Sequence, residues 1–229
     1  MLIILQWVQL ILRGLTSSFI ASLEIGVTLI LESTPQDFPK KNMALSDTIW
    51  WTKKARIKAE KRLLFNDISS QIILLWYSLF TVCVSIFELK EPSTNGYFAV
   101  IMVSLSVLIL CASLFIGNRN FKERAMLLKQ CYEQLSEVEA KTRQNDADIN
   151  ILGTEYQNIL SVSENHSEID FKYALVSEYL NSHDPKKDLT RTPTKYNVFE
   201  VILYVLYSYL KLLFFILIPP LVVMFLRCS

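Results

Sequence analysis

Two long uncharged runs separated by a short loop constrain this chain more than any other feature. ISSQIILLWYSLFTVCVSIFE covers residues 68–88 with no charge before Glu88, and YFAVIMVSLSVLILCASLFIG covers 97–117 with none. A helix needs about 20 mostly apolar residues to cross the hydrocarbon core of a bilayer, so each run is long enough. Residues 89–96 between them contain Pro92, Asn95 and Gly96, which are typical of a turn. The pattern predicts a transmembrane hairpin over residues 68–117.

The remainder of the chain is strongly charged, and this contrast indicates the fold class. Of the 229 residues 52% are hydrophobic and 20% are charged, while the net charge is only +1. Such segregation is typical of an all-α integral membrane protein with helices outside the bilayer. Five glycines are too few for a glycine-rich phosphate loop or for a sheet with many tight turns.

Basic residues flank the hairpin on both sides. Residues 43–67 are predicted to form a basic juxtamembrane helix that carries Trp50 and Trp51. A basic helix with tryptophans can bind nucleic acid, but the adjacent apolar run favours contact of its lysines and arginines with lipid headgroups. Lysine and arginine crowd 53–62 and 119–129, whereas the hairpin loop has only Lys90. By the positive-inside rule, both flanks of the hairpin face the cytoplasm.

Residues 118–193 are predicted to form a cytoplasmic helical region. Its first part has apolar residues at steps of 4, 3, 4 and 3, namely Phe121, Ala125, Leu128, Tyr132 and Leu135. This stripe is expected either to pack inside its own domain or to form a seam with another helix or another copy. A polar connector at 141–150, a helix over 153–180 and a loop at 182–193 are expected to follow.

The two ends of the chain are apolar. Residues 1–42 form an N-terminal extension with Arg13 and Glu24 in its apolar part and a linker at 33–42. This extension is either a further membrane-associated helix or not part of the native product, with Met43 as the start. Residues 194–229 are expected to enter the membrane, as a full span, a re-entrant segment or an interfacial helix, with the full span favoured. Lys211 in this segment would then be a pore-facing or pairing residue, and Pro219 with Pro220 would kink the helix.

Few residues are arranged for chemistry. The chain has no nucleophile–base pair, no paired carboxylates, no phosphate loop and no zinc spacing, so we expect neither enzymatic activity nor a cofactor. Cys83, Cys111, Cys131 and Cys228 are expected to be free thiols.

The segment SENHSEID, residues 163–170, holds the nearest candidates. On a helix His166 and Asp170 would share one face, which suits a hydrogen bond that orients the imidazole. A hydrolase using Glu164, His166 and Asp170 is possible in principle, but a polar latch or cap at the end of a cytoplasmic helix is the favoured interpretation.

A second set of candidates follows the hairpin in GNRNFKERAMLLKQCY, residues 117–132. Arg119, Lys122 and Arg124 are candidates for binding an anionic ligand or the nucleic-acid part of a partner. Contact with lipid headgroups explains them as well and is favoured.

Several of these motifs, in this order, resemble one family. WTKKARIKAEKRLL (51–64), the hairpin, GNRNFKERAMLLKQCY and ENHSEID (164–170) are similar to the SLATT family, which are two-transmembrane effectors of bacterial defence systems. The resemblance covers roughly residues 45–180 and is greatest to the subgroup encoded beside reverse transcriptases. It implies a pore-forming toxin of the bacterial inner membrane that acts in a retron by abortive infection. It also implies a reverse transcriptase with its RNA–DNA hybrid as the partner that holds the effector inactive.

Pore formation by such a chain requires several copies. The backbone of a single hairpin is satisfied internally and its sides face lipid, so it encloses no aqueous path. Small polar residues can line or join a homo-oligomer, and the hairpin carries Ser78, Thr81, Ser85, Ser104, Ser106 and Ser113. The alternative function is a membrane anchor or adaptor that tethers a partner enzyme and conducts nothing.

Overall fold

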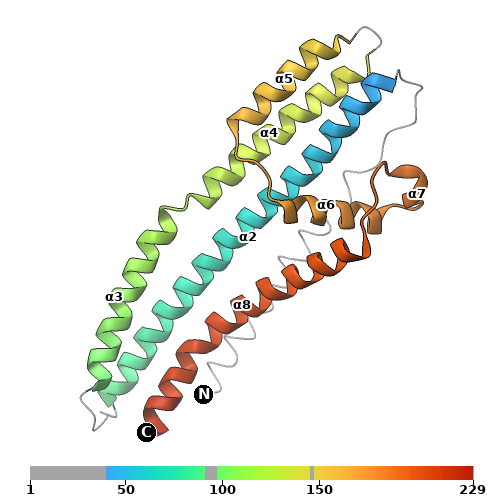
Figure 1. Ribbon diagram of the computed structural model, residues 1–229. Helices are drawn as coiled ribbons and strands as arrows, with labels where there is room; N and C mark the ends of the chain where they lie inside the picture. The colour runs from blue at the N-terminus through green and yellow to red at the C-terminus, as the bar shows by residue number, and fades with distance from the viewer. Residues whose placement is uncertain (1–39, 91–96, 145–146, 229) are drawn as a thin grey trace. The chain divides into compact units, whose positions relative to one another are not determined.

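A computed structural model of the protein describes residues 40–90, 97–144 and 147–228, and every regular element in these ranges is a helix (Figure 1). The all-α prediction is therefore confirmed. The helices are α2 (Lys40–Lys90), α3 (Tyr97–Gly117), α4 (Phe121–Thr142), α5 (Ile149–Val162), α6 (Glu168–Asn181), α7 (Pro185–Asp188) and α8 (Lys195–Cys228). The apolar N-terminal run at 1–31, and the choice between Met1 and Met43 as the start, lie outside the residues whose structure is described.

Helix α2 is one continuous helix of 51 residues. It contains both the basic segment and the first apolar run, without a break between them. The sequence explains this continuity, because no glycine or proline occurs from Lys40 to Lys90 and Pro92 follows just beyond the end. One rigid element therefore extends from the charged helices into the apolar part of the molecule.

A tight corner joins α3 to α4. Asn120 has φ 46° and ψ 41°, in the left-handed region, and is the one non-glycine residue with positive φ among the described residues. Asparagine tolerates this conformation better than most side chains. The backbone N–H groups of Asn118, Arg119 and Asn120 donate to the carbonyls of Leu114, Ile116 and Gly117, and so close the last turn of α3. The motif GNRN thus builds the boundary between the apolar helix and the charged one.

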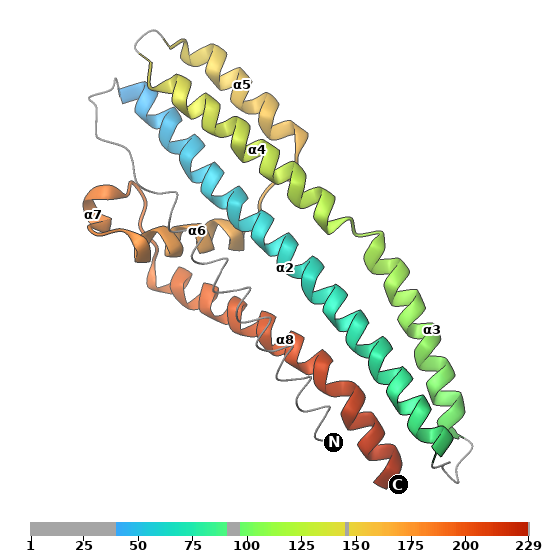
Figure 2. The same cartoon turned by 180° about the vertical axis from the view of Figure 1, so that it is seen from behind.

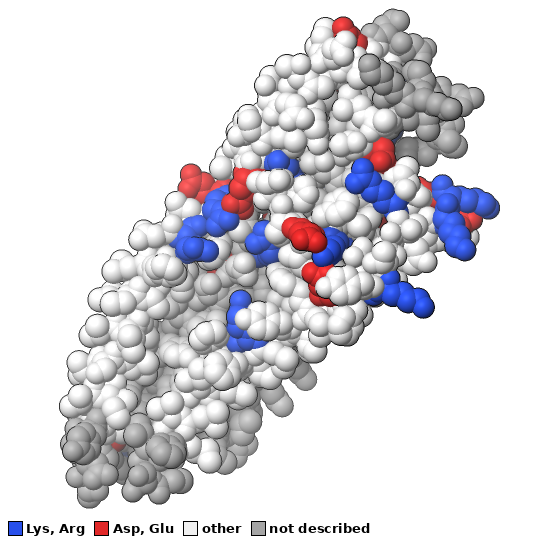
Figure 3. Space-filling model, in the orientation of Figure 1, with Lys and Arg blue, Asp and Glu red and all other residues white. Residues whose placement is uncertain are grey.

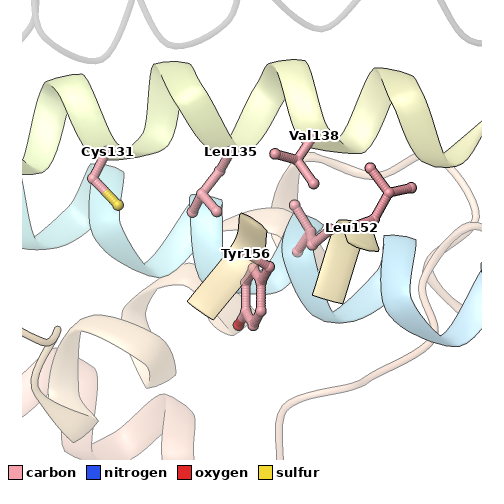
Figure 4. Packing of buried hydrophobic residues seen from close by; sticks show 6 residues of the cluster. Cys131, Leu135, Val138, Leu152 and Tyr156 are labelled. Atoms are coloured by element: carbon pink, nitrogen blue, oxygen red, sulfur yellow. The ribbon is translucent and has the colours of Figure 1, made fainter. Parts of the chain in front are cut away.

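Helix α4 packs along the N-terminal half of α2 (Figure 2). One cluster joins Ala59 and Leu63 of α2 to Ala125 and Leu128 of α4. A second cluster combines α2, α4 and α5 through Ile49, Cys131, Leu135, Val138, Leu152 and Tyr156, and Figure 4 shows most of these side chains between the helices. The apolar stripe of α4 is therefore buried inside its own domain, the first of the two alternatives.

The helix expected over residues 153–180 is in fact two helices, so this prediction was wrong. Helix α5 ends at Val162 and α6 begins at Glu168. Ser167 is the N-cap of α6, and Asp170 at the N3 position accepts a hydrogen bond from the Ser167 backbone N–H at 2.9 Å. Such capping starts a new helix. Residues 163–167 form the connector between α5 and α6.

Three helices, α2, α3 and α8, are long and apolar enough to cross a membrane. Helix α8 continues through Pro219 and Pro220. It contacts α2 through an edge-to-face pair of the Phe65 and Tyr209 rings, with centroids 5.8 Å apart. It contacts α6 through an ion pair of Lys172 Nζ with Glu200 Oε2 at 2.7 Å.

Candidate functional site

Several basic residues of α2 form ion pairs with acidic residues of the other charged helices. Lys53 Nζ lies 2.5 Å from Glu139 Oε2 of α4, and Lys54 Nζ lies 3.1 Å from Glu178 Oε2 of α6. Trp51 is buried, and its indole N–H donates to Thr190 Oγ1 at 2.9 Å. These three residues thus have partners inside the chain, and the partners come from distant parts of the sequence. Contact of the segment with lipid headgroups stays a prediction.

Charged side chains of both signs gather over the same region of the surface. On the face shown in Figure 3 they are intermixed around the helices outside the apolar part, and the surface over α3 is almost free of them. Within this region, ion pairs such as Lys53–Glu139 and Lys54–Glu178 join different helices.

The most connected group of these side chains lies where α2, α4, α6 and the connector meet. We call this group the polar junction, and it consists of Arg56, Arg62, Arg124, Ser163, Glu164, His166 and Asp170.

A two-pronged ion pair fixes α6 to α2. Arg62 Nε donates to Asp170 Oδ1 at 2.9 Å, and Nη2 donates to Oδ2 at 3.0 Å. Asp170 Oδ2 also accepts from the Ser167 hydroxyl at 2.6 Å. The hydrogen bonds to Asp170 raise the pKa of the Arg62 guanidinium, and Asp170 itself is only 3% exposed. Such a paired geometry is specific to arginine and carboxylate.

A second ion pair fixes the connector to α4. Arg124 Nε and Nη2 both donate to Glu164 Oε2, at 2.9 and 2.5 Å. Both side chains are about one-third exposed, so this pair is more accessible to solvent than that of Arg62 and Asp170. The connector is consequently held between α4 and α2.

Arg56 lies in the interior of the junction and is only 1% exposed. Its Nη1 donates to the Ser163 hydroxyl and to Cys131 Sγ, and its Nε has no hydrogen-bond partner. Among the described residues no carboxylate lies within ion-pair distance of it. A buried charge without a counter-ion is costly, so the packing of α2, α4 and α5 has to hold Arg56 in place.

His166 is half-buried and lies on the connector, before α6 begins. Its Nδ1 has no hydrogen-bond partner, and its ring centroid lies 6.2 Å from that of Phe171. Burial lowers the pKa of His166, the charge of Arg56 lowers it further, and Asp170 opposes both. The shared helical face expected for His166 and Asp170 does not exist, because only Asp170 is helical. The Asp170 carboxylate is bonded to Arg62 and Ser167 instead.

This arrangement is suited to holding helices together. The Ser163 hydroxyl accepts from Arg56, and the carboxylates of Glu164 and Asp170 are bonded to arginines. No residue that the structure describes is hydrogen-bonded to His166 Nδ1. Among the described residues no group of three or more histidine, cysteine, aspartate and glutamate side chains could hold a metal ion.

The other predicted site residues lie apart from the junction. Arg119 and Lys122 are exposed at the start of α4, and the Arg119 guanidinium lies 5.8 Å from the Phe121 ring centroid. Lys211 is exposed on α8, between the residues of α8 that contact Phe65 and Trp76 of α2. Of the predicted site residues, the structure therefore brings together Arg124, Glu164, His166 and Asp170. Arg119, Lys122 and Lys211 lie outside the polar junction.

Sequence reasoning missed Arg56 and Arg62 as members of the junction. A signal for Arg56 was present, because it falls on the stripe of Ile49, Ala59 and Leu63 at helical spacing. A charged residue within a buried stripe indicates a polar contact inside the domain.

The fold and the junction define a class of protein, a helical membrane protein whose charged helices are tied to the helix that enters the membrane. Residues 39–226 match the SMODS and SLOG-associating 2TM effector domain family 5, and the chain belongs to this family. It is thus a membrane effector of defence systems. The match includes α8, and so extends beyond the residues that carried the resemblance in the sequence. Comparison with curated proteins gives no match, and comparison with solved structures gives none either.

Proposed function

We propose that this chain is the toxin of an antiphage defence system that permeabilises the bacterial inner membrane on infection. Loss of the membrane potential then stops the infected cell before phage is released, which is abortive infection. The protein acts as a homo-oligomer, because one hairpin encloses no aqueous path. The charged helices lie in the cytoplasm.

The observation that carries this proposal is the continuity of α2. The same helix binds α4 and α6 through Lys53, Lys54 and Arg62, and continues without a break into the apolar run. A change imposed on the cytoplasmic helices by a partner is therefore passed to the membrane by a rigid element. An anchor that conducts nothing does not need this coupling.

The hairpin itself is suited to assembly in lipid. Phe98 and Met102 of α3 are buried, but most of its other described side chains are exposed, so much of its surface is available to lipid or to other copies. The hydroxyls of Thr81, Ser85, Ser104 and Ser106 donate to carbonyls four residues earlier in the same helix. Hydroxyls satisfied in this way can face a neighbouring helix at little cost, and small residues allow close approach.

The partner we propose is a reverse transcriptase with its RNA–DNA hybrid, in a retron. This part rests on the resemblance of GNRNFKERA and ENHS to the effectors encoded beside reverse transcriptases. Arg119, in the turn before α4, and Lys122, in the first turn of α4, are exposed and available to phosphate groups, either of a partner nucleic acid or of lipid.

The test is the membrane potential of cells that express the protein alone, with its genomic neighbours, and with neighbours and phage. A voltage-sensitive dye is read beside propidium uptake. We expect rapid depolarisation by the protein alone, suppression by the neighbours and its return on infection. Cells that stay polarised in all three conditions, with membrane insertion confirmed, would establish the anchor function instead.

A matched pair of variants tests the coupling through α2. Arg62→Gln removes the bond to Asp170, whereas Lys141→Gln removes an exposed pair with Glu155 that does not involve α2. We expect Arg62→Gln to alter suppression by the neighbours and Lys141→Gln to leave it unchanged. Equal behaviour of the two variants would refute the coupling.

A further inference from the structure

The most unusual polar contact inside the apolar part of the chain joins α2 to α8. Trp76 Nε1 donates a hydrogen bond to the backbone carbonyl of Ile216 at 3.0 Å, and the bond is buried. Trp76 and Ile216 are each 4% exposed. A tryptophan side chain bonded to a helical carbonyl is unexpected, because such carbonyls normally accept from the N–H four residues later in the same helix.

Proline explains why this carbonyl is free. The N–H that would bond to Ile216 belongs to residue 220, and residue 220 is proline. Proline has no N–H, so Pro220 leaves the Ile216 carbonyl without its partner in the helix. Inside a bilayer no water can replace that partner, and an unsatisfied group costs several kcal/mol. The indole of Trp76 supplies the donor that Pro220 removes.

The rest of the contact between the apolar parts of α2 and α8 is small. Among the described side chains from 210 to 224 of α8, the buried ones are Leu212, Ile216 and Pro219, which follow one face of the helix. Most of its other side chains are exposed. Packing between apolar helices has no hydrophobic driving force in lipid, so a directional bond contributes much to keeping α8 on α2.

Two contacts with α2 also show where α8 lies relative to the apolar run of α2, and hence to the membrane. Tyr209 packs on Phe65, just before the apolar run of α2, and Ile216 bonds to Trp76 within that run. The two helices thus run in the same direction. The 20 residues from Tyr209 to Cys228 span about 30 Å as a helix, enough to cross a bilayer. Lys211 then lies near the boundary of the membrane rather than at its centre.

We propose that Trp76 and Pro220 form an interhelical clasp that keeps α8 docked on α2 as a third membrane-spanning helix in the resting protein. Undocking of α8 breaks the bond and leaves the Ile216 carbonyl exposed to lipid. The clasp therefore opposes any rearrangement of the membrane helices until a partner or a second copy provides another donor. That regulatory consequence rests on the proposed permeabilising function, whereas the clasp itself does not.

A double-mutant cycle on the purified full chain in detergent tests the clasp. Trp76→Phe removes the donor and keeps an aromatic ring, and Pro220→Ala returns the N–H to the helix. We expect Trp76→Phe to lower the thermal midpoint by about 2–4 °C when residue 220 is proline, and by much less in the Pro220→Ala background. Pro219→Ala is the matched control, because it restores the bond to the Phe215 carbonyl, which Trp76 does not contact. An equal effect of Trp76→Phe in all three backgrounds would overturn the clasp.

The regulatory consequence is measured separately, in vesicles of phosphatidylethanolamine and phosphatidylglycerol that hold a potassium diffusion potential. We expect Trp76→Phe to raise the basal leak several-fold over the unmodified chain, and Trp76→Phe with Pro220→Ala to return it to the original level. A leak unchanged by Trp76→Phe, from a chain that does permeabilise when concentrated, would overturn the resting-state role. A chain that never permeabilises would refute the proposed function, and the thermal cycle would still decide the clasp.

Discussion

Asp170 is the carboxylate that joins α6 to α2 in the polar junction. It accepts bonds from Arg62, from the Ser167 hydroxyl and from the Ser167 backbone. Asp170→Asn keeps the shape but removes the charge and leaves the Arg62 guanidinium without its counter-ion. Since breaking a largely buried pair is strongly destabilising, we expect a loss of about 3 kcal/mol in the free energy of unfolding. Denaturation of the purified protein in detergent, followed by circular dichroism, measures this loss.

The control for Asp170→Asn is the pair of Lys141 and Glu155, at 2.6 Å and largely exposed. Glu155→Gln should cost no more than about 1 kcal/mol, because solvent screens exposed pairs. If the two variants were equally stable, burial would not be what makes the Asp170 pair important.

Protonation of His166 should weaken the junction at acidic pH. Burial and the nearby Arg56 charge lower its pKa below the ordinary value of 6.5. The unfolded chain therefore takes up the proton first, and the contribution of neutral His166 to stability is complete above pH 6.5 and is lost as pH falls through its folded pKa. We expect the stability of the protein to fall as pH drops below 6.5, and His166→Gln to remove part of that fall. His183→Gln, at an exposed position, should leave the fall unchanged.

At the scale of elements, the corner at Asn120 fixes the direction in which α4 leaves α3. Because φ is 46°, a side chain with a Cβ is strained there and glycine is not. We expect Asn120→Ala to lower the free energy of unfolding by about 1 kcal/mol and Asn120→Gly to be close to neutral. Asn118→Ala, in the same turn but without positive φ, is the control. A loss from Asn120→Gly as large as that from Asn120→Ala would mean that the asparagine side chain, not the backbone, is what matters.

The elements also show what could be predicted from this sequence. The apolar runs are long and the stripe of α4 is regular, so the helices α3 and α4 followed from pattern alone. The break between α5 and α6 did not, because residues 163–167 carry no glycine or proline and the start of α6 depends on the bonds of Ser167 and Asp170. The partners of the α2 lysines and arginines were missed for a related reason. Ion pairs between distant residues depend on the tertiary fold, and a local excess of basic residues resembles a headgroup-binding segment.

At the scale of the whole described chain, α2 is the element through which the other parts are connected. Its N-terminal half binds α4, α5 and α6, and its apolar half binds α3 and α8. The clasp at Trp76 and the junction at Arg62 lie on the same helix, four turns apart by the helical repeat of about 3.6 residues. A force applied to α6 therefore reaches the contact of α8 along a continuous backbone.

The orientation of the membrane helices gives the last prediction. If α2 and α8 both leave the cytoplasm in the same direction and α3 returns, the end of α8 lies outside the inner membrane. Alkaline phosphatase fused after Ser229 should then be active, because it folds only outside the cytoplasm, and a green fluorescent protein at the same position should be dark. The same two reporters fused after Asp188, which removes α8, should give the reverse result. Fluorescence from both fusion points would mean that α8 lies along the membrane surface and does not cross, and the two-helix hairpin would then be the whole membrane-spanning unit of the residues that the structure describes.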